Sequence, residues 1–302
     1  MSYFRKPPPL YQTTNQAKWW YAMCAYGSNG SKGSPQWARD KHDAMAPLDP
    51  LAPSVMRPWW VITHKGHQPV SDDVVQEIRE RTAKGYRVLW RSRDHFQHMR
   101  DDVARMADAD ALPECVGAGN ELEFGKQITP AELYHLAQDI MLNLTYFQET
   151  YGVKISPPSF SSFVNIRDGY GSALRPLVEG RDGIVLAVHN YRYLDPSMWG
   201  RYAVMDETRD ILGLPDADVL VEECAYSFAK EVATSPSERL LGHWGTSFHQ
   251  RALQAAVDLR MPVCPFMNYH QGHHFNDISD PQYGAARYDA GRRLITELRS
   301  NV

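Results

Sequence analysis

Two kinds of segment, distinguished by their pattern of apolar and polar positions, alternate along the chain. Short apolar runs recur, and the polar segments between them carry apolar residues at helical spacing. Some runs, such as GIVLAV, are continuously apolar, which is typical of parallel strands that are covered on both faces. The runs predict eight strands, which lie within residues 19–27, 58–66, 86–94, 114–121, 153–160, 183–191, 217–227 and 262–271.

Helix signals separate the strand signals. A helix is predicted over 71–85, where Ser71 can serve as the N-cap and a glycine ends the pattern. A longer helix is predicted over 129–151, because Thr129 and Glu132 stand in capping-box positions and a glycine follows directly after it. Further helices are expected up to about residue 111, within 171–180, and over 198–212, 237–259 and 281–298.

Eight strand–helix units in one chain predict an α/β fold, a single (β/α)8 TIM barrel. We place the barrel at residues 18–302, after a lead-in at 1–17 that three consecutive prolines keep extended. A doubly wound open sheet is the alternative. The number of units favours the barrel, and no glycine-rich dinucleotide turn follows the first strand.

Composition and charge exclude several classes of protein. The chain has 302 residues, of which 43% are hydrophobic and 23% charged, as in ordinary globular proteins. Its 32 basic and 36 acidic residues give a net charge of −4, and there is no basic run, so we expect no nucleic-acid partner. No apolar stretch approaches the ~20 residues of a membrane helix. The first residues lack an apolar signal core, which favours a cytoplasmic location.

Two residue types are expected to serve packing. The four cysteines show no paired short spacing, so we expect buried free thiols and no zinc or redox motif; they are Cys24, Cys115, Cys224 and Cys264. Trp59 and Trp60 are adjacent in the second strand and must point to opposite faces of it. Core packing is the expectation for both.

Candidate chemistry lies at the carboxyl ends of the strands, where TIM barrels carry their active sites. Acids, imidazoles, phenols and an arginine gather at these ends. They include His64, Arg91, Asn120, Glu121, His189, Tyr191, Glu222, Glu223, Tyr269 and His270.

Two of these ends carry carboxylates that could act together. Glu121 ends the fourth strand, and Glu222 and Glu223 end the seventh. These two strands lie across the mouth of a barrel from each other. Hydrolysis of a glycosidic bond needs one carboxyl group to protonate the leaving oxygen and a second to attack the anomeric carbon or activate water. Side-chain alternation along the seventh strand leaves either Glu222 or Glu223 as the second group.

The segments GAGNELEFG, AVHNY and VLVEECAYS resemble the ends of strands four, six and seven in the clan A glycoside hydrolases. The resemblance implies a retaining hydrolase of β-linked glycosides or polysaccharides that works by double displacement without a cofactor or metal. By this similarity Glu121 is the acid/base and Glu223 the nucleophile, while Asn120 holds the hydroxyl next to the anomeric carbon. Sugar-binding roles are expected for His64, Arg91, His189, Tyr191, Tyr269 and His270.

Two other classes compete with this hypothesis. One is a non-catalytic barrel that binds a glycan or a protein partner, because a fold does not fix a function. The other is a metal hydrolase, since HQGHH at 270–274, together with His64 and His67, supplies five imidazoles near the mouth. The chain lacks the helical His-Glu pair motif and a His-X-His on the first strand, and this favours loop histidines that bind sugar hydroxyls.

Overall fold

The fold was analysed in a computed structural model of the chain. It describes residues 22–25, 59–64, 68–93, 96–122, 128–160, 169–190, 203–224 and 263–265. The helices expected over 237–259 and 281–298, and the lead-in at 1–17, lie outside the described residues.

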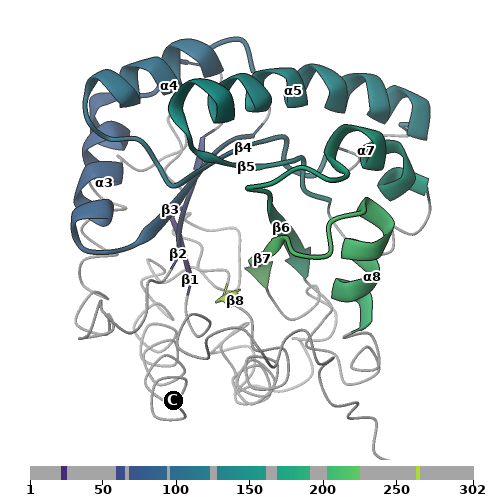
Figure 1. Ribbon diagram of the computed structural model, residues 1–302. Helices are drawn as coiled ribbons and strands as arrows, with labels where there is room; N and C mark the ends of the chain where they lie inside the picture. Colours follow the sequence, from purple (N-terminus) through teal and green to yellow (C-terminus); the bar gives the residue numbers. More distant parts are fainter. Residues whose placement is uncertain are drawn as a thin grey trace, which may run out of the picture.

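Within the described residues, eight parallel strands form the centre of the molecule (Figure 1). Five of them pair in consecutive order: β1 (Ala22–Ala25), β2 (Trp59–His64), β3 (Arg87–Ser92), β4 (Cys115–Ala118) and β5 (Lys154–Ser156). The other three also pair in order: β6 (Val185–Asn190), β7 (Asp218–Cys224) and β8 (Val263–Pro265). A parallel bridge from Ile155 to Ile184 links the two groups, and β8 lies against β1. This order is that of the predicted parallel barrel.

Helices cover the outside of the strands. They are α3 (Asp72–Ala83), α4 (Met99–Asp108), α5 (Pro130–Tyr151), α7 (Gly171–Val178) and α8 (Ala203–Leu212). Figure 1 shows α4 and α5 across the top of the view and α7 and α8 on its right side. Each lies within a predicted helical segment, which confirms the α/β pattern. No helix in these described segments is both long and apolar enough to cross a membrane.

The capping residues predicted from the sequence make their expected hydrogen bonds at one helix start and not at another. The capping box of α5 is present as predicted, since the Thr129 side chain accepts a hydrogen bond from the Glu132 amide and Glu132 reaches back to the Thr129 amide. At the start of α3, Ser71 occupies the N-cap position as predicted, although its hydroxyl makes no capping hydrogen bond. The segment before α3 is instead bound by α4, because Asp102 accepts a hydrogen bond from the Val70 amide at 2.7 Å.

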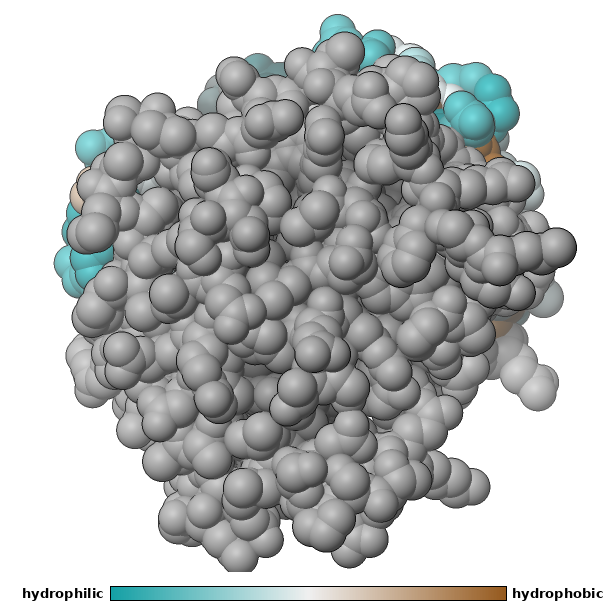
Figure 2. Space-filling model, turned by 90° about the horizontal axis from the view of Figure 1, so that it is seen from below, coloured by the Kyte–Doolittle hydropathy of each residue, from teal (hydrophilic) through white to brown (hydrophobic). Residues whose placement is uncertain are grey.

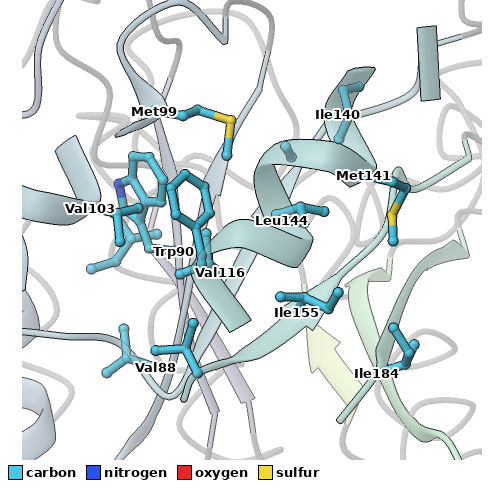
Figure 3. Packing of buried hydrophobic residues seen from close by; sticks show 14 of the residues in the cluster. Val88, Trp90, Met99, Val103, Val116, Ile140, Met141, Leu144, Ile155 and Ile184 are labelled. Atoms are coloured by element: carbon cyan, nitrogen blue, oxygen red, sulfur yellow. The ribbon is translucent and has the colours of Figure 1, made fainter. Parts of the chain in front are cut away.

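The larger hydrophobic cluster fills the space between the strands and the helices. Figure 3 shows how Trp90 and Val116 from the strands meet Met99 of α4 and Leu144 of α5. Trp60 belongs to this outer cluster. Seen from below, the described residues that reach the rim of the molecule are mostly hydrophilic (teal in Figure 2), as expected for helix faces that contact water.

A smaller cluster lies on the opposite side of the strands, inside the barrel. It consists of Trp59, Val61, Leu89, Cys115, Val185, Ala187 and Leu220. Trp59 and Trp60 therefore face opposite sides, and both are core residues, as predicted. Cys115 is a buried free thiol, and burial raises its pKa far above the ordinary range. It is thus a packing residue.

The amino ends of three strands are joined by ion pairs. Arg87 contacts Glu114 at 2.7 Å and Asp218 at 3.1 Å, and Lys154 contacts the same Asp218 oxygen at 2.8 Å. The Arg87 guanidinium also lies 4.0 Å from the centre of the Trp59 ring. This group links β3, β5 and β7 at the end of the barrel opposite to the predicted site.

Candidate functional site

Regular strand geometry stops before the predicted acid. Strand β4 ends at Ala118, and the next residues leave extended conformation, because Gly119 has φ 77° and Glu121 has φ 49°. We expected residues 114–121 to form one strand, in which side chains alternate between the two faces as far as Glu121. That alternation is wrong beyond Ala118. A left-handed turn, and not strand parity, determines where Glu121 lies.

Backbone hydrogen bonds on both sides fix this turn. The Glu121 amide donates to the Ser159 carbonyl at 3.0 Å, and the Ser159 amide donates to the Gly119 carbonyl at 3.0 Å. On the β3 side, the Gly119 amide donates to the Ser92 carbonyl at 2.9 Å. Glu121 as a whole is half-buried.

Asn120 lies in the middle of the same turn. Its backbone pairs with Ser159 in an isolated parallel bridge, and its amide donates to the Arg93 carbonyl at 3.2 Å. The Ser159 hydroxyl lies 3.5 Å from the Asn120 side-chain oxygen, and only 6% of Asn120 is exposed. The amide side chain is thus oriented by the protein.

Arg91 is fully buried beneath this turn, at 0% exposure. Its Nη1 donates to the carbonyls of Gly119 at 3.0 Å and Pro157 at 3.3 Å, and its Nη2 donates to the Ser156 hydroxyl at 2.8 Å. The side chain predicted to bind sugar is therefore engaged with the protein at the ends of β4 and β5.

Strand β7 contains one residue more than its neighbours at the predicted nucleophile. Val221 pairs with Val188, but the next pair is Glu223 with His189, so Glu222 is the additional residue. The pairing with β8 shows the same shift between Val221 and Cys224. Such a bulge changes which residues share a face with the preceding part of the strand.

The remaining predicted residues fall into two groups. His64 is fully buried and stacks on Trp90 with ring centres 6.0 Å apart, on the strand face that packs against the helices. The structure therefore does not bring His64 to Arg91, which shares the opposite strand face with Leu89. Beyond the described residues lie the side chains of Glu223 and His189 and all of Tyr191, Tyr269, His270 and the other histidines of HQGHH.

Ser156 and Ser159 were missed by the sequence analysis. The fifth strand contributed no candidate, because its end reads SPPS, without an acid, imidazole or phenol. The available signal was small hydroxyl residues directly after an apolar strand. Their partners, Arg91 and Asn120, come from strands earlier in the chain, and this pairing follows only from the fold.

Solved structures resemble this one, although the sequence has no match among protein-family models or curated proteins. The GH53 catalytic domain of Ignisphaera aggregans aligns with a TM-score of 0.52 at 14% identity, over 83% of this chain and 84% of that one. An endo-laminarinase from Formosa Hel1_33_131 aligns at 0.51 and 12% identity, over 86% and 82%. GH26C from Muricauda sp. MAR_2010_75 aligns at 0.52 and 10% identity, over 95% and 88%. At such low identity the likeness shows the fold alone, which is the predicted (β/α)8 barrel.

The described site offers an acid, an amide and hydroxyl groups at one end of the barrel. Within the described residues, no three His, Cys, Asp or Glu side chains are placed to hold a metal ion together. The groups present suit hydrogen bonding to a polyhydroxylated ligand and proton transfer by Glu121.

Proposed function

We propose that the protein is a retaining glycoside hydrolase that acts on β-linked glycosides or polysaccharides. Glu223 attacks the anomeric carbon and expels the leaving group, while Glu121 donates a proton to the departing oxygen. In the second step Glu121 removes a proton from water, which displaces Glu223 from the sugar. The carbohydrate is thus cleaved with two inversions and net retention.

The observation that carries this proposal is that each of the two strands leaves regular geometry at its glutamate. Glu121 adopts a left-handed conformation, and β7 has its additional residue immediately before Glu223. Both strands are parallel, so their carboxyl ends lie at the same end of the barrel. Positive φ in a residue other than glycine, and bulges, are both enriched at functional sites.

The bulge favours Glu223 over Glu222. Val185 and Ala187 line the barrel interior, and His189 is the next residue of β6 at the same two-residue spacing. Glu223 is the residue of β7 in register with His189. Without the additional residue, Glu222 would have continued the interior series of Leu220. We therefore assign the nucleophile to Glu223.

Asn120 is assigned to the hydroxyl beside the anomeric carbon, because the bridge to Ser159 and the neighbouring turn orient its amide. His189, Tyr191, Tyr269 and His270 are proposed to bind the sugar, on their positions at strand ends alone. We leave His64 out of this set because it packs between β2, β3 and the helices. The similar structures include an endo-laminarinase and a xylanase, which supports a β-linked polysaccharide as substrate.

The test compares two adjacent substitutions, Glu223→Gln and Glu222→Gln. The probes are nitrophenyl β-glycosides, laminarin and xylan. We expect Glu223→Gln to lower kcat by several orders of magnitude, because the nucleophile contributes a covalent step. Glu222→Gln removes the same charge one residue away and should retain activity within about tenfold. Circular dichroism and thermal unfolding are the controls that check whether both variants fold.

Other results would favour one of the two competing functions, a non-catalytic glycan-binding barrel or a metal hydrolase. A barrel that only binds glycans should retain laminarin or xylan binding and hydrolyse nothing in either form. Loss of activity on chelation, with residual turnover in Glu223→Gln, would indicate a metal hydrolase. Near-wild-type turnover of Glu223→Gln would refute the nucleophile assignment.

A further inference from the structure

Arg91 connects the ends of β4 and β5 between the last pair of their ladder and the Asn120–Ser159 bridge. The β4–β5 ladder spans the pairs from Cys115–Lys154 to Gly117–Ser156. Beyond it, the guanidinium of Arg91 bonds the Gly119 carbonyl on one side and the Pro157 carbonyl and Ser156 hydroxyl on the other. A planar guanidinium holds such a set of acceptors in one fixed geometry, which a lysine cannot reproduce.

Gly117 leaves the space that this guanidinium occupies. A Cβ added to Gly117 would lie 3.2 Å from the Arg91 Cζ and 3.2 Å from the Ser156 Cβ. The absence of a side chain at Gly117 therefore lets Arg91 lie directly against β4. The space beside Gly117 inside the barrel is therefore filled by the Arg91 guanidinium.

We propose that Arg91 is a positioning residue that sets the turn carrying Asn120 and Glu121, and that it does not bind substrate. The Arg91 guanidinium holds the carbonyl of Gly119, the residue at which the left-handed turn begins. The same carbonyl accepts the Ser159 amide, and the Ser159 carbonyl accepts the Glu121 amide. Three hydrogen bonds in series thus connect the guanidinium to the backbone of the acid. Because the side chain is fully buried, a sugar hydroxyl cannot reach it.

The proposal rests on the proposed function for its kinetic effect. If Glu121 is the acid/base, a small displacement of its backbone should slow proton donation to the leaving oxygen. Misplacement of about 1 Å can cost about 100-fold in rate. The loss should be large for substrates that need the acid and small for those with activated aryl leaving groups.

The experiment uses the full chain with Arg91→Met, Arg91→Lys and Gly117→Ala. Arg91→Met removes the donors, Arg91→Lys keeps the charge, and Gly117→Ala keeps every donor but displaces the guanidinium. The matched control is Arg81→Lys, because Arg81 is also fully buried but lies on α3 over the Trp60 ring, 4.0 Å from its centre. Each variant is assayed on methyl and dinitrophenyl β-glycosides, at a temperature well below its Tm.

We expect Arg91→Met to lower kcat about 100-fold on the methyl glycoside and less than about tenfold on the dinitrophenyl glycoside, with KM nearly unchanged. The kcat values of Arg91→Lys and Gly117→Ala on the methyl glycoside should fall between those of Arg91→Met and wild type. Arg81→Lys should affect both substrates equally. A raised KM with unchanged kcat in Arg91→Lys and Gly117→Ala would overturn the proposal in favour of substrate binding. Equal losses on both glycosides would overturn it in favour of general stability.

Amide hydrogen exchange separates this proposal from the proposed function. Exchange of the Gly119, Glu121 and Ser159 amides should rise in Arg91→Met, while exchange in β2 stays unchanged. This readout needs no turnover. If wild type hydrolyses no glycoside, the proposed function fails, and raised exchange at these amides still supports the positioning role. Unchanged exchange at all three overturns it.

Discussion

Glu121 shows how a single residue departs from its secondary structure at a candidate site. Left-handed backbone is unfavourable for a residue with a Cβ and persists only where its surroundings impose it. Here the neighbouring amides and carbonyls of Gly119 and Ser159 impose it. The turn also puts Glu121 outside the ladder, where the residue is half-buried instead of packed in the core. Such partial exposure suits a group that must exchange protons with water.

Replacing Glu121 with Gln should depend on the leaving group. Without its acid, the enzyme must expel the leaving oxygen as an anion, so kcat on a methyl β-glycoside should fall by about 100-fold or more. A dinitrophenyl glycoside leaves readily without a proton, so its first step should be little affected. Steady-state rates on the two substrates make the comparison. Equal losses on both would argue against the acid role, provided that thermal unfolding shows an intact fold.

The sequence identified Glu121 and Asn120 as residues at a strand end, but not their conformation. The pattern at 114–121 is compatible with a continuous strand, and the φ angles depend on Ser92, Arg93 and Ser159, which lie elsewhere in the chain. For the same reason Arg91 was expected to bind substrate. Its hydrogen-bond partners in the protein, at the ends of β4 and β5, become visible only when the strands are assembled.

At the scale of elements, short-range signals were the most reliable. The capping box of α5 depends on two residues three positions apart, so the sequence contains everything that is needed to predict it. The start of α3 differs because contacts from α4 bind the preceding segment: Arg105 donates to the Val70 carbonyl, and Asp102 accepts from the Val70 amide. A local pattern at Ser71 cannot report these long-range partners.

The capping box makes the stability of the protein depend on pH. The Thr129 amide and hydroxyl donate to the Glu132 carboxylate at 2.8 Å, and the amide hydrogen bond is the main cause that holds the pKa of Glu132 below its ordinary value. A lowered pKa means that the ionised carboxylate stabilises the fold above the unfolded pKa, and that this is lost as the pH falls through the folded value. Glu132→Gln should therefore reduce stability at neutral pH and make less difference in acid.

Urea unfolding at neutral pH and at about pH 3 measures this effect. The control is Glu149→Gln, which removes an exposed acid from the same helix, far from its amino end. Its stability curve should run parallel to that of wild type. If Glu132→Gln also runs parallel, the capping carboxylate does not contribute.

At the scale of the molecule, the order of the eight described parallel strands could be predicted because each strand has its own apolar run in the sequence. The register between units could not. The bulge in β7 is one example, since VLVEEC alternates equally well with either glutamate inside, and only pairing with β6 and β8 distinguishes them. The ion pairs at the amino ends are another, because Arg87 and Asp218 are far apart in the chain.

The ion pairs at the amino ends of the strands predict a second pH dependence of folding stability, which arises only when the strands assemble into the barrel. Burial alone would raise the pKa of Asp218, but Lys154 and Arg87 outweigh it and hold that pKa below its ordinary value. The ionised carboxylate thus stabilises the fold above the unfolded pKa, and the contribution disappears as the pH falls through the lowered value. Because the Asp218 side chain is 47% exposed, water and salt screen part of the interaction.

Asp218→Asn should lower the free energy of unfolding at neutral pH, and the difference from wild type should shrink as the pH falls through the lowered pKa of Asp218. The control is Asp216→Asn, which removes an exposed acid two residues earlier. Added salt should reduce the effect of Asp218→Asn and leave the control unchanged. A stability difference that is independent of pH would mean that Asp218 acts through packing and not through its charge. Since the ion pairs lie at the end of the barrel opposite to Glu121, kcat of the folded variant should remain that of wild type.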